Sequence, residues 1–237
     1  MVRKEKRSIS ERMYDLRLQT PFTMIIASPS KSGKSTLVSK LLLRADEYFS
    51  TKSNALYYFY NVWSPTFNDL KKEKPEIIFI KGMCDKEWLE DKCGNKSNIT
   101  VILDDQAMNI NKEIAEVFSV GSHQHHCNFV LLAQNLFTKN KFFRDASLNA
   151  TYIILGKNPR DKSSVRFLAQ QMLPGKMKEL VDAYDIATKK PFTHLLLDFN
   201  QSTPDHLRMR SNIMQDNDIP MSVYIKRLKI YARNTHI

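Results

Sequence analysis

The sequence has few cysteines, few glycines and no long hydrophobic segment. Its three cysteines, Cys84, Cys93 and Cys127, cannot all pair and stand far apart, which argues against a disulfide scaffold and favours a reducing compartment. Six glycines and nine prolines among 237 residues exclude a collagenous or low-complexity chain. No apolar run approaches the roughly 18 residues that span a bilayer, and the basic first residues lead into no apolar signal segment. We therefore expect an intracellular globular protein that does not enter a membrane.

Acidic residues are outnumbered by basic ones. Lysine and arginine total 36 and aspartate and glutamate total 25, which gives a formal net charge of +11. A surface of this kind favours a polyanionic partner, although many soluble proteins are basic without binding nucleic acid. Three basic segments could contact phosphates or could simply be solvated, and they lie at 139–141, 189–190 and 226–229.

Short apolar runs alternate with helical patterns along most of the chain. The runs predict strands at 22–27, 56–60, 76–80, 100–103, 129–133, 152–155 and 194–197, with the one at 76–80 at a sheet edge. Apolar spacing predicts helices at 34–44, 112–120, 162–172 and 176–187, and a short helix at 8–19. This alternation predicts an α/β fold with a mostly parallel central sheet and helices on both faces. We divide the chain into an N-terminal extension (1–20), one α/β domain (21–213) and a basic C-terminal extension (214–237).

A loop of small residues separates the first predicted strand from the first long helix. It matches the phosphate-binding (Walker A) pattern G-x-x-x-x-G-K-[ST], except that a serine replaces the first glycine. In such a loop, backbone N–H groups surround phosphates at a helix N-terminus, the lysine reaches the β- and γ-phosphates, and the following hydroxyl binds Mg²⁺. The serine weakens the match because it tolerates a positive φ poorly. We expect the following residues to bind ATP: Ser28, Pro29, Ser30, Lys31, Ser32, Gly33, Lys34, Ser35 and Thr36.

Acidic and amide side chains end two later strands. Asp104 and Asp105 follow the strand at 100–103, at the carboxyl end where open α/β sheets bind ligands. As in a Walker B motif, Asp104 is placed to hold Mg²⁺ and Asp105 to orient or deprotonate the attacking water. Gln134 ends the strand at 129–133, and its amide can bond both the γ-phosphate and that water. We expect the strands that end in the loop and in the two acids to be neighbours.

Each of these motifs also has a purely structural interpretation. The loop could be a serine-rich helix cap, the two acids a solvated strand end, and Gln134 a turn residue. The cluster His123, His125, His126 and Cys127 suggests a zinc site, but its ligands are adjacent and lack the paired spacing of structural zinc sites. We therefore expect no metal at that cluster, and a loop facing DNA is an alternative for it.

Six segments together resemble the genome-packaging ATPases of the FtsK–HerA superfamily. They are 28–36, 103–105, 130–137 (Val-Leu-Leu-Ala-Gln-Asn-Leu-Phe), 147–149 (Ser-Leu-Asn), 157–161 (Lys-Asn-Pro-Arg-Asp) and 203–206 (Thr-Pro-Asp-His). The likeness covers about 22–213 and is greatest to the ATPases of polinton-like elements and adintoviruses, with those of virophages and poxviruses more distant. The resemblance implies a RecA-like P-loop fold of the additional-strand class.

The same resemblance implies a motor. It implies Mg²⁺-dependent ATP hydrolysis by a homo-oligomeric ring, a pentamer or hexamer, that drives double-stranded DNA into a preformed capsid through a vertex or portal protein. Such a motor would act in the nucleus or viral factory of a host cell, and the virion is a second location. It would contact DNA phosphates rather than bases, so its binding would weaken with salt.

The family also requires an arginine supplied across the subunit interface to stabilise charge on the transferred phosphoryl group. Arg144, just before the Ser-Leu-Asn segment, is favoured over Arg160 in the Asn-Pro-Arg-Asp segment. Either arginine could instead be a surface residue that pairs with a neighbouring acid such as Asp145 or Asp161.

Three other functions remain open from the sequence. A replicative helicase or translocase shares the chemistry but would have to separate strands. A nucleotide kinase would need a monophosphate pocket and an arginine-rich lid, whereas the segment after Gln134 has only scattered arginines. A non-catalytic DNA-binding protein with a degenerate loop would not turn over nucleotide.

Overall fold

In the described residues, the seven apolar runs and two further short strands form a single sheet of nine strands. The structure is a computed structural model and describes residues 14–93, 98–118, 126–214 and 221–224. The strands are β1 (Thr23–Ala27), β2 (Ala55–Tyr60), β3 (Ile77–Lys81), β4 (Ile99–Leu103), β5 (Asn128–Ala133), β6 (Tyr152–Gly156), β7 (His194–Asp198), β8 (Met209–Ser211) and β9 (Ser222–Val223). Their order is β3-β2-β4-β5-β1-β6-β7-β8-β9. The six strands from β3 to β6 are parallel, and β7, β8 and β9 add an antiparallel edge.

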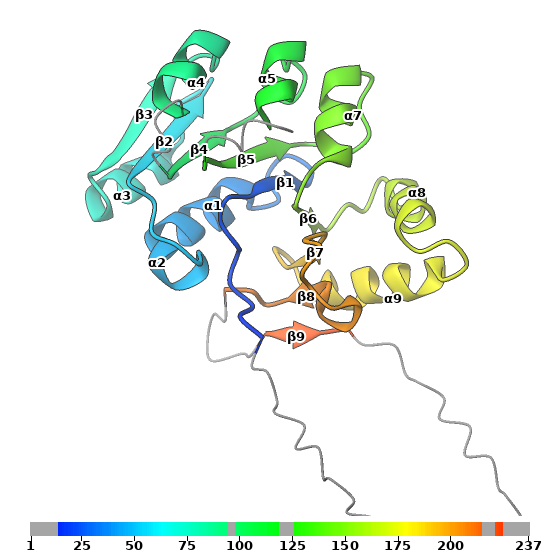
Figure 1. Cartoon of the computed structure of the whole chain (residues 1–237). Helices are drawn as coiled ribbons and strands as arrows, with labels where there is room; N and C mark the ends of the chain where they lie inside the picture. Colours follow the sequence, from blue (N-terminus) through cyan, green and yellow to red (C-terminus); the bar gives the residue numbers. More distant parts are fainter. Residues whose placement is uncertain (1–13, 94–97, 119–125, 215–220, 225–237) are drawn as a thin grey trace, which may run out of the picture.

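Helices cover both faces of this sheet, as the alternating pattern predicts (Figure 1). Their bounds are α1 (Lys34–Leu43), α2 (Ala45–Tyr48), α3 (Pro65–Glu73), α4 (Lys86–Cys93), α5 (Lys112–Glu116), α7 (Lys141–Leu148), α8 (Ser163–Met172) and α9 (Met177–Ala187), with a short 3₁₀ turn at Asp205–Leu207. One core cluster packs α1, α2 and α3 against one face of the sheet, and a second packs α4, α5, α7, α8 and α9 against the other. Strands β1, β4 and β5 are buried at every position because helices cover both of their faces.

The strand order identifies the additional-strand class. β5 lies between β1, which leads into the P-loop, and β4, which ends at the two acids. The expectation that β1 and β4 are direct neighbours is therefore wrong. The register still brings all three strand ends to one edge, because Ala27 pairs with Ala133 and Leu103 pairs with Leu131. The inserted strand places Gln134 between the loop and the acids.

One helix prediction needs correction. Residues 14–19 form no helix, and the part at 8–13 lies outside the described residues. Leu18 instead bonds with the end of α2, its N–H donating to Tyr48 and its carbonyl accepting from Ser50. Tertiary pairing thus replaces the weak local helix signal. The helix predicted at 112–120 begins at Lys112 as α5, its helical geometry continues through residues 117–118, and residues 119–120 lie outside the described part.

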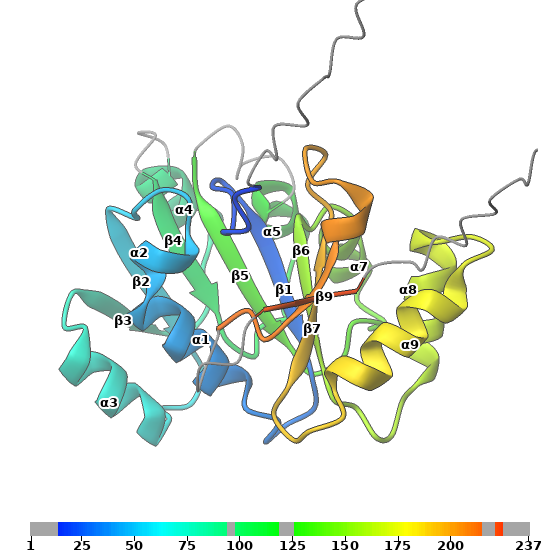
Figure 2. The same ribbon diagram turned by 90° about the horizontal axis from the view of Figure 1, so that it is seen from below.

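The remaining predicted strands and long helices are present, and β3 lies at the edge of the sheet. Helices α2, α3, α4 and α7 and strands β8 and β9 were not predicted, because these helices have nine residues or fewer and the two strands have three and two, too few for a pattern to repeat. Figure 2 shows β7 beside α9, on the opposite side of the molecule from α3, and β8 and β9 continue the sheet beyond β7. None of the helices in the described ranges is long and apolar enough to cross a membrane. The proposed division into three segments stays a prediction.

Candidate nucleotide site

The loop between β1 and α1 adopts a conformation suited to an anion. Gly33 has a φ of 88° and Lys31 a φ of 61°, so the left-handed positions lie in the middle and at the end of the loop. In the described structure, the backbone N–H groups of residues 30–33 donate no hydrogen bond. Successive N–H groups with such alternating geometry form a concave anion site at the start of a helix. The loop therefore has the donors that phosphate oxygens require.

Ser28 departs from the usual glycine without straining the backbone. It is absent from the described residues with a positive φ, and its N–H donates to the Ala133 carbonyl at 3.1 Å, which continues the pairing of β1 with β5. Its side chain lies against Gly156 at the end of β6. A Cβ placed on Gly156 would lie 2.2 Å from Ser28 Oγ and 2.7 Å from Ser28 Cβ. The glycine on the neighbouring strand thus makes room for the serine, a pairing that the sequence pattern does not reveal.

Lys34 bonds to its own loop. Its Nζ donates to the Ser28 carbonyl at 2.6 Å and to the Pro29 carbonyl at 2.9 Å. Burial lowers the pKa of Lys34, and the carboxylates of Asp104 and Asp105 partly oppose that shift. A partly buried ammonium next to a concave set of N–H groups favours binding of a polyphosphate, whose oxygens would replace the two carbonyls.

Asp104 is held by two hydroxyl groups. Tyr58 OH donates to Asp104 Oδ2 at 2.9 Å, and Ser35 Oγ donates to the same oxygen at 3.4 Å. Burial raises the pKa of Asp104, while the bond from Tyr58 lowers it. Burial also raises the pKa of Tyr58 well above 10.0, so the phenol stays a donor. Sequence reasoning missed Tyr58, and its only signal was an aromatic strand ending at the same sheet edge.

These two side chains fit a magnesium ion. Mg²⁺ prefers oxygen ligands and is commonly held by one or two protein groups together with phosphate oxygens and waters. Ser35 Oγ and Asp104 Oδ2 lie within hydrogen-bond distance of each other beside the loop, which is the oxygen donor set that such an ion uses. Within the described residues, no group of three or more His, Cys, Asp or Glu side chains could hold a metal without such help.

Asp105 and Gln134 form the far side of the site. Gln134 Nε2 donates to Asp105 Oδ1 at 3.2 Å, and both side chains are exposed. Asp105 has a φ of 55°, a conformation that aspartate adopts more readily than most residues. Its carbonyl accepts a bond from Asn61 Nδ2 at 3.2 Å, a contact that the sequence did not predict. A carboxylate and an amide in contact, both open to solvent, can orient a water molecule between them.

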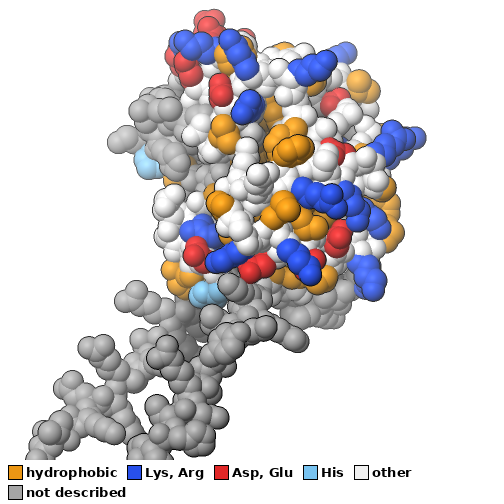
Figure 3. All heavy atoms as spheres, turned by 90° about the vertical axis from the view of Figure 1, so that its right-hand side faces the viewer, with side chains coloured by type: hydrophobic (Ala, Val, Ile, Leu, Met, Phe, Trp, Pro, Cys, Tyr) orange, Lys and Arg blue, Asp and Glu red, His pale blue; other side chains and the backbone are white. Residues whose placement is uncertain are grey.

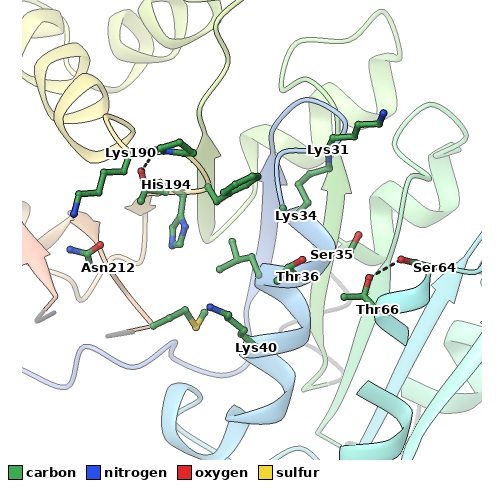
Figure 4. Close-up of a pocket in the computed structure, with 16 residues that line it drawn as sticks. Lys31, Lys34, Ser35, Thr36, Lys40, Ser64, Thr66, Lys190, His194 and Asn212 are labelled. Carbon is green, nitrogen blue, oxygen red and sulfur yellow. Dashed lines mark hydrogen bonds between the residues drawn. The ribbon is translucent and has the colours of Figure 1, made fainter. Parts of the chain in front are cut away.

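A cavity of about 830 Å³ opens beside the loop. One wall is α1, with Thr36 and Lys40, and the opposite wall is the segment 190–194 that leads into β7 (Figure 4). The start of α3 closes a third side, where Ser64 and Thr66 bond to each other. Pockets of roughly 300–1,000 Å³ accept small ligands, so this one has room for a nucleoside.

In the described residues, no side-chain hydrogen bond or ion pair joins either candidate arginine to the phosphate-binding loop, the two acids or Gln134. Arg144 is exposed in α7, and Arg160 is exposed in the loop that follows β6 at the same edge as the P-loop. Neither forms an ion pair with Asp145 or Asp161 in the described residues. Asp161 instead accepts bonds from Ser163 and Ser164 at the start of α8. The role of Arg144 or Arg160 at the site of a neighbouring subunit stays a prediction.

Two of the four residues of the histidine cluster, His123 and His125, lie outside the described residues. Cys127 at its end is buried, and none of Cys84, Cys93 and Cys127 forms a disulfide in the described residues.

The comparisons with known proteins agree with this geometry at the level of fold. No protein-family model and no curated protein matches the sequence. Among solved structures, B204, the DNA-packaging ATPase of Sulfolobus turreted icosahedral virus, aligns with a TM-score of 0.52 at 12% identity, over 77% of this chain and 94% of B204. The chain has the fold of the P-loop ATPases. The genome-packaging NTPase B204 of Sulfolobus turreted icosahedral virus 2, in complex with ATP-gammaS, aligns over the same shares at 15% identity with a TM-score of 0.49.

Proposed function

We propose that this P-loop protein is a Mg²⁺-dependent ATPase that drives double-stranded DNA into a preformed viral capsid. The observation that carries the ATPase proposal is the meeting of three strand ends. β1 presents the loop and Lys34, β4 presents Asp104 and Asp105, and β5 between them presents Gln134. A phosphate-binding loop alone would serve a kinase equally well. The interposed strand with an amide in contact with the second acid favours hydrolysis, because it provides groups that can position water.

Each residue has a distinct task in this proposal. The N–H groups of residues 30–33 and the Lys34 ammonium bind the phosphates. Ser35 and Asp104 would hold Mg²⁺, which would neutralise charge on the phosphate oxygens. Asp105 accepts a proton from the attacking water or orients it, and Gln134 donates to Asp105 and orients that water from the other side.

The task of DNA packaging is supported by the resemblance described above, by the net charge of +11, and by the fold shared with B204, which is a DNA-packaging ATPase. On the face near α8 and α9, Lys and Arg side chains are interspersed with acidic and hydrophobic ones (Figure 3). That face has no uniformly basic patch. The proposal includes a homo-oligomeric ring acting at a capsid vertex or portal protein, in the nucleus or viral factory of the host cell and in the virion.

ATP hydrolysis tests the site directly. Lys34→Ala and Asp105→Ala should each abolish steady-state turnover and leave the circular dichroism spectrum unchanged, because both side chains are at least partly exposed. Lys178→Ala and Asp182→Ala are matched controls on the exposed side of α9, and they should hydrolyse ATP at the wild-type rate. Normal turnover in both site variants would contradict the assignment.

Mixing subunits tests the trans arginine. Arg144→Ala subunits keep an intact P-loop, and Lys34→Ala subunits keep an intact arginine. Each pure population should be inactive, and a mixture should recover hydrolysis where an intact loop meets an intact arginine. The same experiment with Arg160→Ala distinguishes the two candidates, and absence of recovery at every ratio excludes the arginine tested.

Duplex DNA distinguishes the motor from its rivals. Hydrolysis should rise when blunt duplex DNA is added, and the effect should fall steeply with salt because the contacts are to phosphates. A forked substrate should not be unwound. Unwinding would favour a helicase, and activity that is indifferent to DNA but stimulated by a nucleoside monophosphate would favour a kinase.

A further inference from the structure

An exposed aromatic ring lies against the P-loop. Phe192, in the loop between α9 and β7, is 74% exposed, yet its Cδ1 atom is 3.3 Å from where a Cβ on Gly33 would be. Phe192 also has a φ of 62°, which is rare for a bulky residue. A ring held in solvent on an unusual backbone marks a position shaped for a ligand rather than for the core.

The ring lines the cavity into which a nucleoside would extend. The cavity of about 830 Å³ includes both the loop residues Lys31, Gly33 and Lys34 and the segment 190–194. Phosphates bound at the start of α1 would occupy only the end of this space. The rest lies between α1 and that segment, where Figure 4 shows Lys190 and His194 opposite Thr36 and Lys40.

The sheet order sets the direction of the bound nucleotide. β5 and β4 lie on one side of β1 and carry Gln134, Asp104 and Asp105, while β6 and β7 lie on the other side. Phe192 precedes β7 and therefore stands on the side of the loop away from the acids. With the γ-phosphate toward the acids and Gln134, the nucleoside points toward Phe192.

We propose that Phe192 stacks on the base of the nucleotide whose phosphates bind the P-loop. The proposal rests on the nucleotide-binding function and adds the group that recognises the nucleoside. A ring face accepts any base, because every base has a π-face. Phe192 therefore adds affinity for nucleotides over inorganic phosphates without choosing adenine over guanine.

Calorimetric titration in Mg²⁺ with two probes tests this inference. ATP carries a base, whereas inorganic tripolyphosphate has the same phosphate chain without one. Phe192→Ala should weaken ATP binding by about 5- to 150-fold and leave tripolyphosphate binding unchanged. Phe167→Ala is the matched control, since this ring is 59% exposed on α8 and lies outside the cavity, and it should bind both probes as wild type does.

A tryptophan gives a second readout. Phe192→Trp should keep the affinity for ATP, and the fluorescence of the added indole, measured against wild type, should change with ATP and not with tripolyphosphate. The outcomes separate the two proposals. If the wild type binds neither ATP nor tripolyphosphate, that result overturns the nucleotide-binding function itself.

Three results overturn the stacking inference alone. In the first, the wild type binds tripolyphosphate but not ATP. In the second, the Phe192→Ala variant binds ATP as tightly as the wild type does. In the third, the Phe192→Ala variant loses affinity for ATP and for tripolyphosphate equally. The last result would mean that Phe192 supports the loop at Gly33 rather than the base.

Discussion

The contact between Ser28 and Gly156 predicts a strong coupling between two substitutions. An alanine at position 156 would place its Cβ 2.2 Å from Ser28 Oγ and 2.7 Å from Ser28 Cβ, well inside the 3.4 Å where ordinary contact begins. Rotation of the serine side chain would move Oγ but not Cβ, so β1 and β6 would have to separate. Overpacking of this kind costs about 1–3 kcal/mol. For a chain of this length each kcal/mol lowers the melting temperature by about 2–4 °C.

A double-mutant cycle isolates this effect. Gly156→Ala should lose about 1–3 kcal/mol of unfolding free energy in urea titration without nucleotide. Ser28→Gly alone should change it by about 1 kcal/mol or less, because it removes a buried hydroxyl without a partner and adds backbone freedom. The double variant should recover most of the loss, since Ser28→Gly removes both atoms that clash.

Gly82 provides the control for this cycle. Gly82 has a φ of 106° and no atom within 4 Å of an added Cβ, so Gly82→Ala strains the backbone without a clash. Ser28→Gly should not rescue that variant. Additive effects of Ser28→Gly and Gly156→Ala would refute the argument that the glycine on β6 accommodates the serine in the loop.

Three further predictions concern Asp104, Lys34 and a buried ion pair. Tyr58→Phe removes a hydrogen-bond donor to Asp104, so Mg²⁺ activation of hydrolysis should weaken by about 10- to 100-fold. Because the bond from Tyr58 lowers the pKa of Asp104, the acid limb of the pH–rate profile should also move to higher pH in this variant. In the wild type, burial raises the pKa of Asp104 above 3.8 and lowers the pKa of Lys34 below 10.5. As the pH falls, the affinity for MgATP should therefore begin to drop above pH 3.8, and as the pH rises, it should begin to drop below pH 10.5. An affinity that stays constant down to pH 3.8 and up to pH 10.5 would contradict the burial of both groups. Asp198→Asn breaks the pair with Arg210, whose Nη2 lies 2.6 Å from Asp198 Oδ2 with both side chains buried, and should lower the free energy of unfolding in urea by about 3–5 kcal/mol; a change below about 1 kcal/mol would show that the pair is not needed.

Much of the candidate nucleotide site was predictable because it is local in sequence. The Walker loop, the two acids and Gln134 each follow directly after a buried strand, and parallel strands present their carboxyl ends at one edge of a sheet. The long helices were predictable for the same reason, since a single amphipathic pattern covers each one. The helices α2, α3, α4 and α7 and the strands β8 and β9 are too short for such a pattern to repeat. The segment at 14–19 pairs with the end of α2 instead of forming its own helix.

The sequence by itself determined which side chains the proposed ATPase could use: those of a phosphate-binding loop, two acids after one strand and an amide after another. Only the tertiary structure decided which groups support them. Tyr58 holds Asp104 from another strand, Gly156 makes room for Ser28, and Phe192 reaches Gly33 from a loop 159 residues away in the chain (192 − 33). The physical reason is that strand order and close packing create these contacts, and neither is encoded in the spacing of neighbouring residues.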